Sequence, residues 1–312
     1  MQKRTIIMLA LVLALAIILV GTTSVFAQED TCTTCHNDTD VITGKVNSWE
    51  ESKHGSGETT AYAGGRDSCA GCHSGGGFST MIADAMNPDD VLGSANPSRI
   101  DCRACHQVHT SYTGDDWALE TTAPVALYAF EGVTFDGGMG NLCANCHQPR
   151  RPMEAVDGIV NVSSTHWGPH HGPQAAMLLG VAGAGDVVGE AAEHATLAEN
   201  TCVTCHMGEG AAHTFAPAVA ACLECHEEAE NFDINGVQTE VQAMLDELKA
   251  ALVAKNMWDA EADELVVGEY PEAEAAALWN YIYIAIEDKS LGVHNTPYAK
   301  ALIEASLAAL GQ

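Results

Sequence analysis

Cysteine spacing is the feature that most constrains what this chain can fold into. All 12 cysteines of the 312-residue sequence lie in Cys-x-x-Cys pairs, and a histidine directly follows each pair. This pattern is the attachment signature of c-type haem, in which two thiols bond to the porphyrin and the adjacent imidazole reaches the iron. It predicts six covalent haems, attached at Cys32 and Cys35, Cys69 and Cys72, Cys102 and Cys105, Cys143 and Cys146, Cys202 and Cys205, and Cys222 and Cys225. The predicted proximal iron ligands are His36, His73, His106, His147, His206 and His226.

Disulfide formation and zinc binding are two other uses of paired cysteines. Exported proteins rich in cysteine usually form disulfides, and paired Cys-x-x-Cys units often bind zinc. Neither use requires a histidine after every pair, so the sequence favours haem.

The remaining histidines supply candidate second ligands. The chain has 14 histidines, six of which are in the motifs, and the other eight are enough to make every iron six-coordinate. His109 lies three positions after His106, so on a helix both imidazoles project from one side. Since two axial ligands approach an iron from opposite faces, His109 is predicted to bind the iron of a neighbouring haem. The same argument applies to His213, which follows His206 closely.

The segment "SSTHWGPHHGPQ" offers His166, His170 and His171, of which one or two are expected on iron. His170 is preferred, because Pro169 and the following Gly-Pro pair restrict its backbone. The predicted distal ligands are His54, His109, His170, His194, His213 and His294.

The N-terminus resembles a secretory signal peptide over residues 1–27. Lys3 and Arg4 precede an apolar run from Ile6 to Val20 and small residues before Gln28. That run is shorter than the about 20 apolar residues that span a bilayer. We therefore expect no stable membrane span after cleavage, and residence in the periplasm, at the cell surface or outside the cell.

The charge balance limits the possible partners. Lys and Arg total 13 against 42 Asp and Glu, a net charge of −29. Nucleic acids require a basic surface, so a nucleic-acid partner is not expected. A redox partner protein with a positive docking patch is compatible with this charge, although the charge also serves solubility.

Apolar periodicity predicts a mainly α fold with extensive loops. Aromatic residues make up only 6% of the chain and long apolar segments are scarce before residue 237, so haem is expected to fill much of the core over residues 28–235. No alternating pattern predicts a sheet. Residues 236–312 are expected to form a C-terminal helical segment that packs on the haem domain, with helices predicted from Val237, over Glu272–Lys289 with Gly292 as a stop, and from Pro297.

Three stretches carry a resemblance beyond the motifs: "SWEESKHG", "WGPHHGPQAAMLLG" and "DKSLGVHNTPYAKAL". With them, the chain resembles bacterial exported multihaem cytochromes c, a group that includes nitrite-reductase-like and tetrathionate-reductase-like proteins and haem-chain conduits. The resemblance implies that His54, His170 and His294 are distal haem ligands. The Cys-x-x-Cys-Lys haem that many nitrite-type reductases use is absent from this sequence.

The sequence therefore predicts an electron-transfer protein rather than an enzyme, with electrons passing along mostly bis-histidine haems in respiratory or extracellular electron transfer. One alternative is a reductase of a small nitrogen or sulfur oxyanion with one open haem; Arg150 and Arg151 form the one obvious cationic cluster near a motif. Another alternative is a subunit of a polymeric haem filament formed by self-association.

Overall fold

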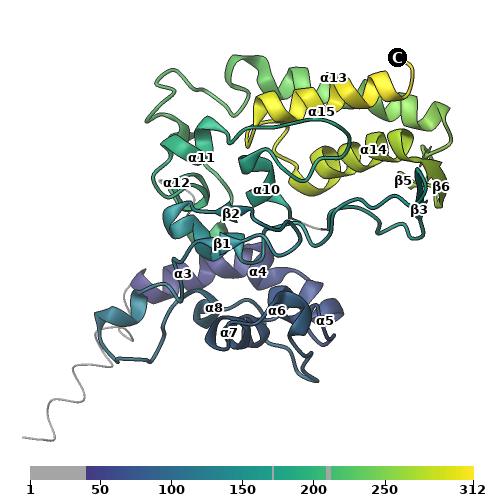
Figure 1. The fold of residues 1–312 in the computed structure, drawn as a ribbon. Helices are drawn as coiled ribbons and strands as arrows, with labels where there is room; N and C mark the ends of the chain where they lie inside the picture. Colours follow the sequence, from purple (N-terminus) through teal and green to yellow (C-terminus); the bar gives the residue numbers. More distant parts are fainter. Residues whose placement is uncertain (1–39, 171, 209–211) are drawn as a thin grey trace, which may run out of the picture.

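The computed structural model describes residues 40–312 apart from residues 171 and 209–211. The predicted signal peptide and the first motif, with Cys32, Cys35 and His36, lie outside the described residues. The described chain is mostly helical, with long irregular connections and a few short strands (Figure 1). The expectation of a mainly α fold with extensive loops is thus confirmed.

The N-terminal lobe, defined here as residues 40–119, consists of short helices stacked at the lower side of Figure 1. Two of its helices carry the second and third motifs. Its helices are α3 (Asp40–Glu51), α4 (Lys53–Ser56), α5 (Thr59–Ala63), α6 (Ala70–His73), α7 (Gly75–Ala83), η1 (Pro88–Asp90), α8 (Cys102–Cys105) and η2 (Gly114–Trp117).

The middle of the chain is the least regular part. Short helical turns again coincide with the motifs, and loops join them. The helices are η3 (Gly138–Gly140), α9 (Asn141–Ala144), α10 (Gln174–Leu179), α11 (Glu193–Leu197), α12 (Cys202–His206), η4 (Ala212–Thr214), η5 (Val219–Cys222) and η6 (Ile234–Gly236).

Contrary to the sequence prediction, the described residues contain three antiparallel strand pairs. Strands β1 (Val125–Ala126) and β2 (Thr134–Phe135) pair, as do β4 (Trp258–Asp259) and β5 (Glu264–Leu265). Pairs of two residues are too short for alternation to be visible in a sequence. The longer pair joins β3 (Ile159–Val162) to β6 (Gly268–Pro271) and thereby ties the middle of the chain to the C-terminal helices.

Three helices end the chain: α13 (Val237–Ala254), α14 (Glu272–Tyr281) and α15 (Thr296–Ala309), close to the ranges predicted. They pack on one another at the upper side of Figure 1. Ion pairs also connect them, from Lys300 to Glu240 at 2.6 Å and from Lys255 to Glu274 at 2.8 Å.

The last part of the predicted second helix differs from a regular α-helix. From Ile282 to Asp288 the chain forms a π-helix, and Lys289, with φ of 61°, ends it before Gly292 is reached. The wider turn changes which side chains face inward. Ile286, which would share a stripe with Leu278 and Ile282 on a regular α-helix, is 38% exposed, whereas Glu287 and Asp288 are buried. A carboxylate therefore enters the interior where a regular helix would place an isoleucine.

The buried side chains are distributed unevenly. One large apolar cluster runs from Val125 to Leu310 and includes Leu278 and Leu302, both fully buried. Trp279, Tyr281 and Tyr283 are buried as well, so this aromatic group packs the helices. The N-terminal lobe shares only a small cluster, made of Ala70, Phe78, Met81, Val91, Ala104 and Leu142.

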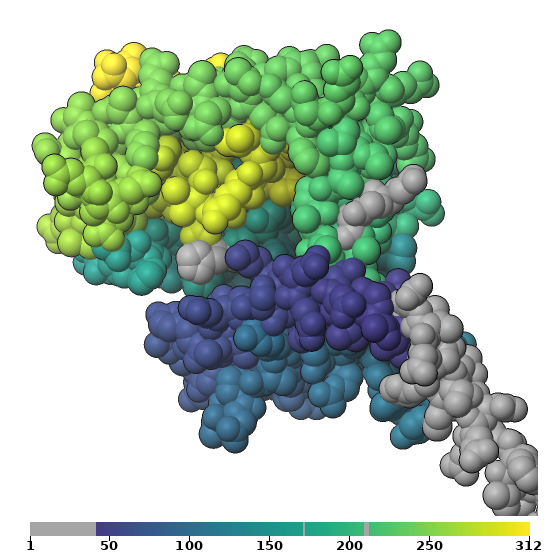
Figure 2. Space-filling model, turned by 180° about the vertical axis from the view of Figure 1, so that it is seen from behind, coloured from purple at the N-terminus to yellow at the C-terminus, as the bar shows by residue number. Residues whose placement is uncertain are grey.

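In the space-filling view the purple and blue N-terminal lobe lies beneath the green and yellow C-terminal part (Figure 2). Helix α3 packs against η4, so the lobe is also in contact with the middle of the chain. Over the described residues, no helix combines the length and apolar character needed to cross a bilayer.

Candidate haem-binding sites

Each described motif forms about one helical turn. The amide of the motif histidine donates to the carbonyl of the first cysteine, four positions earlier, at distances between 2.8 and 3.1 Å in four motifs. Residues three and four positions apart are neighbours on one side of a helix. The turn therefore places both sulfurs and the imidazole beside the same space. The four bonds join His73 to Cys69, His106 to Cys102, His147 to Cys143 and His226 to Cys222.

Every described motif histidine faces one histidine from outside the motifs. The ring centroids in these five pairs lie between 6.1 and 6.4 Å apart. The pairs are His73 with His170 at 6.1 Å, His147 with His54 at 6.2 Å, His106 with His213 at 6.3 Å, His226 with His194 at 6.3 Å and His206 with His294 at 6.4 Å.

These spacings fit a metal ion held between the rings. Two imidazoles that bind one ion from opposite faces, each at about 2 Å, have ring centroids roughly 6 Å apart. The rings are too far apart to stack and too uniformly spaced to be incidental neighbours. Haem iron with two axial histidines suits both this spacing and the adjacent cysteine pairs.

Hydrogen bonds orient five of these imidazoles. In each, Nδ1 contacts an acceptor, which fixes the ring and leaves Nε2 available as the metal ligand. Three of the five are motif histidines and two are their partners. The contacts join His106 to the Trp117 carbonyl at 2.8 Å, His147 to Gln174 Oε1 at 3.1 Å, His206 to the Phe215 carbonyl at 2.8 Å, His194 to the Val293 carbonyl at 2.7 Å and His294 to Asp288 Oδ1 at 2.6 Å.

Burial keeps the paired rings suited to metal binding, which requires neutral imidazole. Burial, with a smaller effect of His147, lowers the pKa of His54 to about 4. Burial likewise lowers the pKa of His147. His294 differs: burial alone would lower its pKa, but the carboxylate of Asp288 outweighs that effect and raises it.

The segment with three histidines places one of them opposite a motif. His170 faces His73, and its φ of 76° lies in the left-handed region that side chains rarely adopt. His166 is exposed, and its backbone amide donates to Ser164. His171 lies outside the described residues. The restricted backbone that favoured His170 is present, since Gly168 and Gly172 also have positive φ.

The backbone at His109 is held by a hydrogen bond to the carboxylate of Asp116. Its φ is 63°, and its amide donates to Asp116 Oδ2 at 2.9 Å. The Asp116 carboxylate also accepts from the amides of Ser111 and Tyr112, which closes the loop. The ring of His109 stacks on Tyr112 with centroids 5.4 Å apart. The histidine of the first motif, His36, lies outside the described residues.

Neighbouring motifs are in direct contact. Cys146 Sγ lies 4.0 Å from the carbonyl of Gly71, inside the second motif, and its thiol is hydrogen-bonded to that of Cys72. Cys202 Sγ lies 3.9 Å from the carbonyl of Gly140, and a hydrogen bond from the thiol of Cys143 lowers the pKa of Cys202 to about 6. With haem attached these sulfurs would be thioethers, which do not titrate. The contacts between motifs are therefore what bears on the arrangement of the haems.

The aromatic ring of Phe215 lies between two of the pairs. Its centroid is 4.8 Å from that of His54 and 6.0 Å from that of His213. The Phe215 carbonyl accepts from His206, so one residue contacts three sites. Nothing in the sequence marks this phenylalanine as a neighbour of His54, because the two residues are far apart along the chain.

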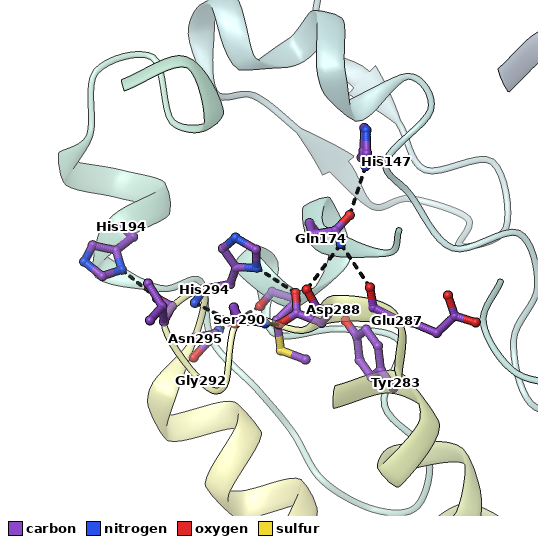
Figure 3. Close-up of polar contacts among 12 residues, drawn as sticks. His147, Gln174, His194, Tyr283, Glu287, Asp288, Ser290, Gly292, His294 and Asn295 are labelled. Atoms are coloured by element: carbon purple, nitrogen blue, oxygen red, sulfur yellow. Dashed lines mark hydrogen bonds and ion pairs between the residues drawn. The ribbon is translucent and has the colours of Figure 1, made fainter. Parts of the chain in front are cut away.

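A polar chain connects the fourth and fifth motifs (Figure 3). Gln174 contacts His147 through Oε1, and its amide nitrogen donates to the carbonyls of Glu287 at 3.1 Å and Asp288 at 3.4 Å. Asp288 in turn accepts from His294. Sequence reasoning missed both Gln174 and Asp288, although the quoted stretches contain them. The partners of Gln174 are distant along the chain, and Asp288 reaches His294 only because the π-turn directs it inward.

The ten described cysteines are free of disulfides. Within the described part of the chain, no group of three or more His, Cys, Asp and Glu side chains forms a bare metal-ion site.

Comparison with solved structures identifies the fold. The chain is similar to the outer cell wall cytochrome OcwA, with a TM-score of 0.55 and 22% identity over 85% of this chain and 50% of that one. It also matches an undecahaem cytochrome from the S-layer of Carboxydothermus ferrireducens, with a TM-score of 0.47 and 20% identity over 82% of this chain and 40% of that one. The chain thus has a fold resembling that of the cytochrome OcwA and spans about half the length of that protein. No family model and no curated protein matches.

Proposed function

We propose that this protein is an exported hexahaem cytochrome c that conducts electrons through bis-histidine haems. The observation that carries the proposal is the pairing of every described motif histidine with a second histidine at 6.1 to 6.4 Å. Covalently attached haem would supply a ferric/ferrous couple at each site. The paired imidazoles keep the coordination unchanged between the two oxidation states.

The ligands of the remaining site, that of the first motif, follow from counting the histidines left over. His36 is the remaining motif histidine and His109 is the remaining predicted distal ligand, so we assign both to one iron. The loop bonded to Asp116 holds the His109 backbone in position for this role. His109 lies just after the third motif, so it would connect the first and third haem sites through a few residues of backbone.

Contacts between motifs support conduction rather than six isolated centres. The second and fourth motifs meet at Cys72 and Cys146, and the fourth and fifth meet at Cys143 and Cys202. Phe215 connects the distal ligands of the third and fourth sites. The fourth site is thus adjacent to three others, and electrons arriving there have more than one neighbouring site.

A place outside the cytoplasm is part of the proposal. It rests on the signal-like sequence of residues 1–27 and on the fold shared with an outer cell wall cytochrome. The partner would be a redox protein that approaches this strongly acidic chain with a positive patch.

The reductase alternative requires one iron with an exchangeable position. Among the described sites each motif histidine has a second histidine opposite it, which supports the conduit instead. Arg150, the cation considered for anion binding, forms an ion pair with Asp89 at 2.8 Å.

The test is the iron spin state of the purified holoprotein. Electron paramagnetic resonance of the oxidised form, and electronic spectra of the reduced form with and without carbon monoxide, are recorded after the haem content has been quantified. Six low-spin irons that do not bind carbon monoxide are expected. A high-spin iron that binds it would overturn full bis-histidine ligation and favour a reductase. Fewer than six haems per chain would contradict the haem count.

A further inference from the structure

The imidazole of His294 is bonded to a buried carboxylate. Its Nδ1 lies 2.6 Å from Asp288 Oδ1, and the side chain of Asp288 is only 1% exposed (Figure 3). At the other oriented sites of the described chain, Nδ1 contacts a backbone carbonyl or, for His147, an amide oxygen. Among these five oriented imidazoles, His294 alone contacts a negatively charged acceptor.

The carboxylate is fixed in place. The other oxygen of Asp288 accepts from the hydroxyl of Ser290 at 2.5 Å and from its amide at 3.2 Å. The Ser290 hydroxyl accepts in turn from the backbone amide of His294 at 3.2 Å. The π-turn that ends at Lys289 brings Asp288 inward, so the pairing is built into the backbone and not into a mobile side chain.

The partner of His294 is oriented as well. His206 donates to the Phe215 carbonyl, so both imidazoles of this pair have an engaged Nδ1. The third site contrasts with it: His213 Nδ1 is buried without a hydrogen-bond partner among the described residues, while His106 contacts the Trp117 carbonyl.

Hydrogen bonding at Nδ1 controls how strongly the opposite nitrogen donates to iron. A charged acceptor draws the Nδ1 hydrogen towards itself and makes Nε2 more electron-rich, and such outer partners are known to tune metal sites. A more strongly donating ligand, with a buried negative charge beside it, favours ferric over ferrous iron. The reduction potential falls as a result.

We infer that Asp288 is a positioning residue that gives the haem site of His206 and His294 a lower reduction potential than that of His106 and His213. The inference rests on the proposed haem ligation. The fifth and third sites both lie beside the fourth. Because electrons move towards the higher reduction potential, they pass from the fifth site to the third.

The central experiment compares the holoprotein with its Asp288→Asn variant. Asparagine keeps the shape and an acceptor oxygen but removes the charge. A potentiometric titration followed by electronic spectra and paramagnetic resonance gives the potential of each haem. We expect one potential to shift upward in the variant, with the g-values of one low-spin signal changing and the other signals unchanged.

Two matched variants distinguish the effect of the hydrogen bond between Asp288 and His294 from the general effect of a nearby negative charge. Glu287→Gln removes a neighbouring buried carboxylate whose side chain extends away from His294 (Figure 3), and we expect a smaller shift. Ser290→Ala removes a donor that competes for Asp288, so we expect the same haem to shift downward. Equal shifts in Asp288→Asn and Glu287→Gln would overturn the inference.

A double-mutant comparison assigns the affected haem. His294→Met raises the potential of its own site, and Asp288→Asn should then add little in that background. If Asp288→Asn acts equally with either ligand, its effect does not pass through His294 and the inference fails. If the wild type itself contains high-spin iron at this site, the proposed ligation fails instead, so the two failures are distinguishable.

Discussion

His170 faces His73 across 6.1 Å, with their ring planes at 89°, although the two residues come from separate parts of the chain. The short helix α6 carries His73, and the glycine- and proline-rich loop before α10 carries His170. A left-handed backbone at His170 is unfavourable for a side chain. Its presence at a candidate ligand is consistent with a position selected for function.

Replacement of His170 by methionine should therefore affect one haem only. Methionine ligation raises the potential of a haem relative to histidine, so one midpoint potential should rise while the others stay. Potentiometric titration with paramagnetic resonance measures this. His166→Ala is the matched control, because His166 is exposed and should leave every potential unchanged. If His166→Ala changed one potential and His170→Met changed none, the ligand would be His166.

Phe215→Ala should perturb two haem sites together. The ring contacts both His54 and His213, so its removal frees both imidazoles to rotate. We expect altered low-spin g-values for two haems and a loss of stability below the about 3–5 kcal/mol typical of a fully buried phenylalanine. Tyr62→Ala, at an exposed aromatic residue, is the control. A change confined to one signal would contradict the bridging position.

Asn280→Ala should destabilise the C-terminal helices. The fully buried Asn280 amide accepts from the Ala184 amide at 2.8 Å and donates to the Ala184 carbonyl and the Ser306 hydroxyl, each at 3.1 Å. Each buried group left without a partner costs about 1–3 kcal/mol. Denaturant unfolding of the holoprotein measures the loss, with exposed Asn231→Ala as control. An unchanged midpoint would mean that water replaces the amide.

Loss of haem should affect the two ends of the molecule unequally. With all motif cysteines replaced by serine, we expect hydrogen exchange to remain slow in α13–α15, whose core contains Leu278, Trp279 and Leu302. The N-terminal lobe has few buried apolar side chains and should exchange rapidly. Equal protection in both parts would show that side chains alone suffice to fold the lobe.

Local features of the fold could be predicted from sequence, and long-range ones only in part. Motif spacing predicts one turn with both sulfurs and the imidazole on one side, because three to four positions span a turn. Apolar periodicity predicts the helices from Val237 and Glu272. The π-turn at Ile282–Asp288 has no such signal, since it depends on packing around the turn.

Contacts between distant parts of the chain could not be predicted from the sequence in the same way. The sequence offered eight spare histidines but not which one faces which motif, because loops of irregular structure bring them together. The resemblance named His54, His170 and His294 as ligands, and the structure places each of them opposite a motif histidine. The contacts of Asp288, Gln174 and Phe215 emerge only in three dimensions.

The long stretch of chain between His206 and His294 affects the order in which the fifth site is assembled. His147 and His226 face histidines that precede them in the sequence, so both rings of these pairs exist once the motif has been synthesised. His206 instead faces a residue that follows almost ninety positions later. Until synthesis reaches residue 294, an iron at His206 would have one protein ligand and an open side. Completion of the fifth site therefore depends on a segment that is made long after its motif.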